Sequence, residues 1–161
     1  MTYLLTENDW VEAYELDGWE VTRLDKSTWG PVLQAATDRQ HRRFAHFPDL
    51  VIAQGEYVAF VDCAGGRPGF DDLTARLDKV VAHREMSEFF GIPVFHAWAT
   101  GHIANVATVA EYGRRGEKNP NGYPGDGNPF LLVPIEHLTV DPRAVAILER
   151  NSISAQLERL P

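Results

Sequence analysis

The chain has 161 residues, of which 44% are apolar and 24% are charged, and its formal net charge at pH 7 is −8. This composition indicates one folded domain and excludes both a disordered chain and a protein that is basic throughout, although a local basic groove stays open. The single cysteine, Cys63, excludes an intrachain disulfide and fits a reducing compartment. No apolar run reaches the roughly 18 residues of a membrane span, and the N-terminus lacks a signal-peptide pattern, so we expect a cytoplasmic protein without a membrane partner.

The first half of the chain predicts helix, strand and hairpin in that order. Thr6 is a suitable N-cap, and the apolar residues that follow recur at helical spacing. Further on, two runs rich in β-branched and aromatic residues flank Gln54-Gly55-Glu56, which predicts a β-hairpin. The expected elements are a helix over 6–17, a strand over 19–24, a short helix over 31–40, and hairpin strands over 50–53 and 57–61.

The second half predicts one long helix and a return to the sheet. Apolar residues at helical spacing indicate a helix over 73–90 that ends at Gly91. The remaining expected elements are a strand over 92–98, a long mobile loop over 112–129, a strand over 130–135, and a helix from 141 to 150 with a shorter helix after it. The order hairpin, helix, strand predicts an α/β fold with a mixed sheet. We expect a single domain over 1–161, with its core in about 6–100 and the C-terminal strand and helices in 130–161.

Two aspartates face each other in the predicted hairpin. If Gly55-Glu56 is a two-residue type II′ turn, Gln54 pairs with Tyr57, and Asp49 lands opposite Asp62. Cross-strand neighbours have Cβ atoms about 4.5–5.5 Å apart, and like charges there are destabilising. A proton or a cation between the carboxylates would relieve the repulsion, and oxygen ligands of this kind suit Mg²⁺. The alternative is a turn-capping aspartate and a solvated strand-end aspartate, and the register favours the metal site.

A third acid and the histidines have weaker signals. Glu7 shares a helix face with apolar residues, which favours an inward partner, although an acid in a first turn also complements the helix dipole. None of the six histidines has zinc-motif spacing, so we expect His83, His96 and His102 to be structural. Cys63 is expected to be a small buried hydrophobe.

Several short motifs follow one another between about residues 6 and 100. They are Glu7, Gly18-Trp19, Pro48-Asp49-Leu50-Val51, the run from Tyr57 to Ala64, and a helix that ends before Gly91-Ile92-Pro93-Val94. In this order they resemble the PD-(D/E)XK nucleases, and within that superfamily the archaeal-type Holliday junction resolvases and related phage enzymes. The resemblance implies a restriction-endonuclease-like mixed β-sheet flanked by helices. It also implies an endonuclease that uses Mg²⁺ or Mn²⁺ to hydrolyse DNA, branched or duplex.

The resemblance further implies roles for single residues. Asp49 and Asp62 would bind the divalent metal ion, Glu7 would assist, and the backbone carbonyl of Cys63 would be a further ligand. The last residue of the family motif is a lysine that orients or activates the attacking water, whereas this chain has Ala64.

Three explanations of Ala64 stay open. A lysine has been changed to alanine to inactivate the enzyme, the lysine has moved (Lys79 and Arg67 are the nearest candidates), or the chain is a degenerate nuclease that only binds DNA or protein. We favour the first, because an inactive lineage would have little reason to keep a repulsive pair of acids. A restriction-type or RNA-directed nuclease would share the same site.

Basic residues near the hairpin and in the predicted loop are candidates for phosphate contact, although a solvated surface is the plainer interpretation of such runs. The nucleic-acid candidates are Arg39, His41, Arg42, Arg43, Arg67, Lys79, Arg114, Arg115 and Lys118. A symmetric DNA junction would favour a two-fold homodimer. The apolar C-terminal helix with Val145, Ile147 and Leu148 is either its interface or part of the core.

Overall fold

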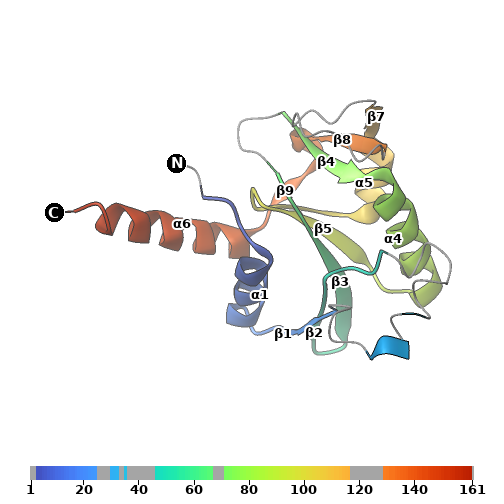
Figure 1. The fold of residues 1–161 in the computed structure, drawn as a ribbon, viewed down its shortest axis with the longest axis horizontal. Helices are drawn as coiled ribbons and strands as arrows, with labels where there is room; N and C mark the ends of the chain where they lie inside the picture. Colours follow the sequence, from blue (N-terminus) through green and yellow to red (C-terminus); the bar gives the residue numbers. More distant parts are fainter. Residues whose placement is uncertain are drawn as a thin grey trace.

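Two β-sheets and the helices that cover them make up the computed structural model (Figure 1), which describes residues 3–24, 30–32, 35, 46–66, 71–116 and 129–160. The helices are α1 (Glu7–Leu16), α4 (Leu77–Phe90), α5 (Val106–Tyr112) and α6 (Pro142–Leu157), with a 3-10 turn at Ile135–His137. The strands are β1 (Glu20–Arg23), β2 (Leu50–Gln54), β3 (Tyr57–Ala64), β4 (Asp72–Arg76), β5 (Val94–Trp98), β6 (His102–Asn105), β7 (Arg114–Gly116), β8 (Phe130–Pro134) and β9 (Thr139–Val140).

The larger sheet is mixed and has the strand order β1-β2-β3-β5-β6-β9. Strand β3 pairs antiparallel with β2 and parallel with β5, so α4 serves as part of the crossover between two neighbouring parallel strands. Strands β4, β8 and β7 form a second, antiparallel sheet. The indole N–H of Trp98 in β5 donates a 2.9 Å hydrogen bond to the carbonyl of Thr74 in β4, which ties the two sheets together.

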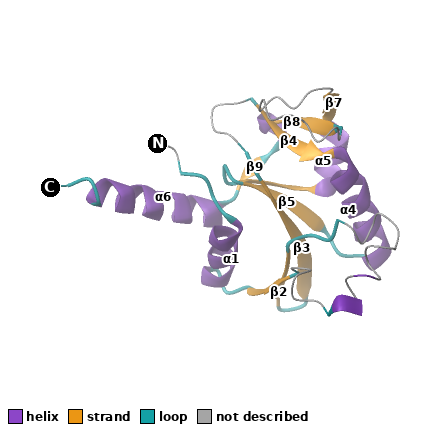
Figure 2. Cartoon of the chain, in the orientation of Figure 1, coloured by secondary structure: helices purple, strands orange, loops and turns teal. Residues whose placement is uncertain are grey.

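The core lies in two layers because side chains alternate along β3. Ala59 and Val61 face the cluster that includes Trp10 of α1 and Ile147 of α6. Phe60, on the opposite side, belongs to the cluster with α4, α5 and the second sheet. Figure 2 shows the same division, with α1 and α6 on one side of the large sheet and α4 and α5 on the other. The predicted α/β fold with helices flanking a mixed sheet is therefore confirmed.

The sequence signals that set local structure act as expected in the first half of the chain. Thr6 caps α1 in a capping box with Asp9, whose carboxylate accepts from the Thr6 backbone N–H. A type II′ turn needs positive φ at its first central residue and not at its second. Gly55 has φ 61°, and no non-glycine residue in the described ranges, Glu56 included, has positive φ. The predicted register follows, with Gln54 opposite Tyr57.

Three expectations need correction. Residues 73–76 belong to β4 rather than to the long helix, which begins at Leu77. Arg114–Gly116, expected in a loop, form β7. The C-terminal helix continues to Leu157 as one element instead of breaking after residue 150. Strands β6 and β9 and helix α5 were not anticipated, and the predicted helix over 31–40 falls mostly outside the described residues. None of the described helices has the length and apolar character that crossing a membrane requires.

Candidate metal centre

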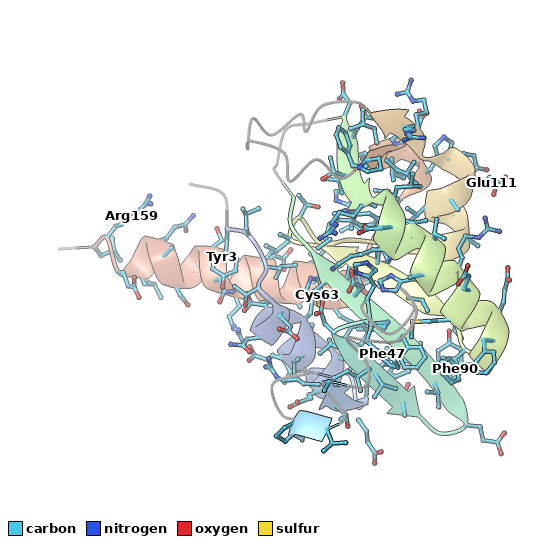
Figure 3. The ribbon with its side chains drawn as sticks, turned by 45° about the vertical axis from the view of Figure 1, so that its right-hand side comes forward. Tyr3, Phe47, Cys63, Phe90, Glu111 and Arg159 are labelled. Carbon is cyan, nitrogen blue, oxygen red and sulfur yellow. The ribbon has the colours of Figure 1, made fainter. Side chains whose placement is uncertain are left out.

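The β2–β3 hairpin brings Asp49 and Asp62 together at the open end of its two strands. Pairing extends to Leu50 opposite Val61, so Asp49 and Asp62 are the next residues outward. Asp49 lies just before β2, and its Oδ2 accepts a 2.8 Å hydrogen bond from the backbone N–H of Cys63. Cys63 lies in the middle of the view in Figure 3, between the helices of the two faces. The juxtaposition inferred from the turn is thus present.

Asp62 is almost fully enclosed by protein. Its relative exposure is 2%, and it shares the α4 side of the sheet with Phe60 because residues two apart on a strand face the same way. Its Oδ2 lies 3.4 Å from Nζ of Lys79, whereas Oδ1 has no hydrogen-bond partner among the described residues. A buried carboxylate oxygen without a partner is costly, and a bound cation or proton would satisfy it.

The surroundings of Asp49 raise the pKa of its carboxyl group. Burial, followed by the nearby charge of Asp62, raises its pKa to about 6. The hydrogen bond from Cys63 and the charge of Lys79 oppose this rise, and Glu7 adds a smaller increase. Mutual repulsion between two carboxylates is what a divalent cation between them would remove, so the donor set fits such an ion.

Lys79 lies in the first turn of α4, and its ammonium is beside the carboxylate of Asp62. Position 64, two residues after Asp62, is Ala64, which packs against the apolar cluster on the α4 side. Lys79 approaches Asp62 from the helix instead of from the strand, and about a third of its side chain stays exposed. The prediction named Lys79 among its candidates, and the structure places its ammonium beside the acid.

Glu7 and Cys63 differ in how directly they join the pair. Glu7 is partly exposed, and its Oε2 lies 3.8 Å from Nη1 of Arg23 in β1, so it already has a cationic partner. The Cys63 side chain packs with the α1 and α6 cluster, as expected of a small hydrophobe, and burial raises the pKa of its thiol well above the usual range. Only its backbone therefore faces the acids.

Two histidines that the spacing analysis treated as structural also reach Asp62. His83 of α4 and His96 of β5 are buried, and their Nδ1 and Nε2 atoms, respectively, are 2.8 Å apart. They are hydrogen-bonded, as predicted, but one ligand atom from each and one from Asp62 lie within 4.8 Å of one another. The two histidines are 13 positions apart, a spacing that matches no motif, so only the packing of α4 on β5 could reveal the group.

The structure describes only some of the residues that the sequence suggests for nucleic-acid contact. Arg114 and Arg115 are exposed on β7 of the second sheet, and Arg114 lies 3.7 Å from the carboxylate of Asp72. They therefore belong to a different sheet from Asp62. Arg39, His41, Arg42, Arg43, Arg67 and Lys118 lie outside the described residues.

Comparison with known proteins tests the fold. No family model matches the chain, and no curated protein matches it in sequence. The fold is similar to that of Hjc, a Holliday junction resolvase from the archaeal hyperthermophile Archaeoglobus fulgidus, with 13% sequence identity, a TM-score of 0.50, and coverage of 81% of this chain and 87% of that one. D212, a nuclease from a fusselovirus, aligns with 11% identity and a TM-score of 0.42 over 91% of this chain and 86% of that one. The chain has the mixed α/β nuclease fold of the archaeal resolvase, as the resemblance predicted.

Proposed function

We propose that this chain is a divalent-metal-dependent endonuclease that hydrolyses phosphodiester bonds in DNA. The observation that carries the proposal is the Asp49–Asp62 pair, in which one acid holds a raised pKa and the other has an unpartnered buried oxygen. Both features are those of a carboxylate pair that a divalent cation would stabilise. The shared fold with a Holliday junction resolvase supports the assignment to this class of enzyme.

Each residue at the pair has a separate task in this proposal. Asp49 and Asp62 hold Mg²⁺ or Mn²⁺ together with the backbone carbonyl of Cys63, and Glu7 adjusts the local charge. When bound, such an ion would supply Lewis-acid chemistry, polarising the phosphoryl oxygen and lowering the pKa of the attacking water. The hydrogen bond from the Cys63 N–H fixes the Asp49 carboxylate, so one oxygen is oriented before the metal arrives.

Lys79 takes the place of the motif lysine in this proposal. Its ammonium is 3.4 Å from Asp62, within reach of a phosphate or water bound at the acids. The other explanation is that Ala64 records an inactivating lysine-to-alanine change. The two explanations differ in outcome. Lys79→Met strongly lowers activity if the first holds, and Ala64→Lys restores activity if the second holds.

Branched DNA is the substrate that we propose to test first. The archaeal protein with the same fold is a Holliday junction resolvase, and a symmetric junction would call for a two-fold dimer of this chain. Duplex DNA, single-stranded DNA and RNA are the competing substrates. Light scattering with and without the junction measures whether two copies assemble.

A cleavage panel tests the proposed function directly. We expect Mg²⁺- or Mn²⁺-dependent cleavage of at least one DNA substrate, and its loss in Asp49→Asn. Lys79→Met should lower the rate by about 10²–10³-fold, in analogy with removal of an oxyanion donor. The matched control is Arg84→Met, which removes a cation from the exposed side of the same helix. No cleavage by wild type and by Ala64→Lys would contradict the proposal.

A binding module without catalysis is the second candidate, and Ala64 is the observation that favours it. In that case the acids would bind no ion. Calorimetric titration with Mg²⁺ and Mn²⁺, with Asp49→Asn as the control, separates the candidates, because only a metal centre gives heat that the substitution removes.

A further inference from the structure

A second group of metal-ligating side chains lies on the α4 side of Asp62. In the parallel β3–β5 pair Asp62 has His96 as its register partner, and His83 reaches both from α4. A carboxylate oxygen of Asp62 and one ring nitrogen of each histidine lie within 4.8 Å of one another. The three residues are at most 2% exposed, so water does not solvate the group.

The hydrogen bonds fix the protonation of both rings. His83 Nε2 lies 2.7 Å from the backbone carbonyl of His46, which can only accept, so Nε2 carries the proton. Both rings are buried, which disfavours a charged imidazole, and only one proton fits between the two nitrogens that face each other. The lone pair of His83 then lies on Nδ1 and accepts from Nε2–H of His96. His83 is thus oriented by a backbone carbonyl, which is how ligating histidines are commonly held.

The carboxylate of Asp62 lacks a full set of hydrogen-bond partners. Its Oδ1 is buried and has no partner among the described residues, while Oδ2 is near Lys79. The two histidine nitrogens satisfy each other through one proton, whereas Oδ1 of the neighbouring Asp62 has no donor. A cation in this position would satisfy all three atoms.

We propose that Asp62, His83 and His96 bind a borderline transition-metal ion of the Zn²⁺ or Co²⁺ type. Two imidazoles and one carboxylate are ligands that such ions prefer, whereas Mg²⁺ prefers an all-oxygen set. Three protein ligands leave a fourth position for water. Tetrahedral bonds of 2.0–2.1 Å would need the two nitrogens about 3.4 Å apart, so the rings separate slightly from their 2.8 Å contact.

Binding requires one proton to move within the pair. The Nε2 proton of His96 occupies the place of the ion, so His96 changes to the Nδ1–H tautomer and remains neutral while Nε2 becomes a ligand. His83 keeps its Nε2–H bond to the His46 carbonyl throughout. The ring charge is therefore unchanged, and the ion replaces a hydrogen bond.

This site does not rest on the proposed nuclease function, although the two share Asp62. The centre at Asp49 and Asp62 uses oxygen ligands, and the histidine site adds two nitrogens to the same carboxylate. If both are real, Zn²⁺ at the histidines competes with Mg²⁺ for Asp62. Asp49→Asn distinguishes them, because it removes a ligand from the first centre alone.

Cobalt titration of the metal-stripped full chain tests the site. We expect one Co²⁺ per chain with visible absorption, and about 100-fold weaker binding in both His83→Gln and His96→Gln. His102→Gln is the matched control, because His102 is a partly buried histidine of β6 that is hydrogen-bonded to Thr100. Asp49→Asn should bind Co²⁺ as wild type does. Wild-type affinity for Co²⁺ in His83→Gln and His96→Gln, or loss of binding in Asp49→Asn, would overturn the proposal.

Imidazole nitrogen NMR on the wild type gives a test that needs no variant. Without metal, His83 and His96 should both show the Nε2–H tautomer. Saturating Zn²⁺ should change His96 to Nδ1–H and leave His83 as Nε2–H. Unchanged His96 resonances under saturating Zn²⁺ would refute the site even if the histidine variants failed to fold.

Discussion

Asp49 and Asp62 show how one residue type acquires two different roles from its surroundings. Asp49 is half-buried and is fixed by the Cys63 N–H, and its pKa is raised by burial and by its neighbour. Asp62 is buried against Lys79 and keeps one oxygen without a partner. The pair is therefore destabilising without a cation.

The raised pKa of Asp49, caused by burial and then by Asp62, predicts that Asp49→Asn stabilises the metal-free protein as the pH rises. The folded pKa is about 6 against 3.8 unfolded, so the native state holds the proton more tightly between those values. Wild type therefore loses stability as the pH rises through this window, and the loss persists above it. Relative to wild type, Asp49→Asn should gain roughly 2–3 kcal/mol from pH 3.5 to pH 7, measured by urea unfolding in chelator.

The control for this experiment is Glu56→Gln in the exposed turn between β2 and β3, which removes a charge of the same sign from a solvated position. Histidine titration in the same pH range affects all variants and cancels in the differences. A flat difference between Asp49→Asn and wild type would mean that the pKa of Asp49 is not raised in the folded protein.

The same residues show what local sequence can and cannot predict. Gly55 sets the turn, the turn sets the register, and the register places Asp49 beside Asp62, so this part of the site could be predicted. The approach of Lys79 depends on where α4 packs, and no short-range pattern contains that information. His96 reaches the group for a similar reason, through a parallel pairing that the turn does not determine.

At the scale of elements, residues 73–76 show how a helical period can mislead. Leu73 has the right spacing to continue the apolar face of α4. In the structure, however, Leu73 and Ala75 are the alternating buried residues of strand β4. Strand β4 pairs with β8, whose residues come more than fifty positions later in the chain. The long-range ladder overrides the local preference, and Arg76, still extended, becomes the N-cap of α4.

The end of α4 gives a prediction for Gly91. Gly91 has φ 66° at the C-cap, and an added Cβ would meet nothing within 4 Å. Gly91→Ala should therefore cost about 1–2 kcal/mol of unfolding free energy through backbone strain alone. The matched control is Gly65→Ala, which also faces open space but lacks positive φ. Equal stability of the two variants, measured by urea unfolding, would contradict this account of the cap.

At the scale of the whole molecule, α6 divides into a docked half and an outer half. Ala144 and Ile147 are buried against α1, and Arg150 forms a two-point ion pair with Glu12. The core alternative for this helix is therefore confirmed. Beyond Arg150 the helix extends away from the body (Figure 1), and its large apolar side chains are exposed.

A chain that stops after Arg150 should consequently lose less than about 1 kcal/mol of stability, because the removed residues bury little surface. Ile147→Ala is the contrasting change and should cost about 2–5 kcal/mol, since Ile147 is 1% exposed. Thermal unfolding of both measures the difference. A large loss on truncation would show that the outer half packs against something in solution, and light scattering of the intact chain would then identify a second copy.

The parallel neighbours β3 and β5 have a kinetic consequence. The hairpin of β2 and β3 closes over a two-residue turn, but β5 can join only after the crossover containing α4 has been formed and docked, at a loop-closure cost. Asp49 and Asp62 are brought together by a short-range closure, whereas His96 reaches Asp62 only through the longer-range β3–β5 ladder. Ions captured by the histidines would accordingly report formation of that ladder, and those captured by the acids alone would not.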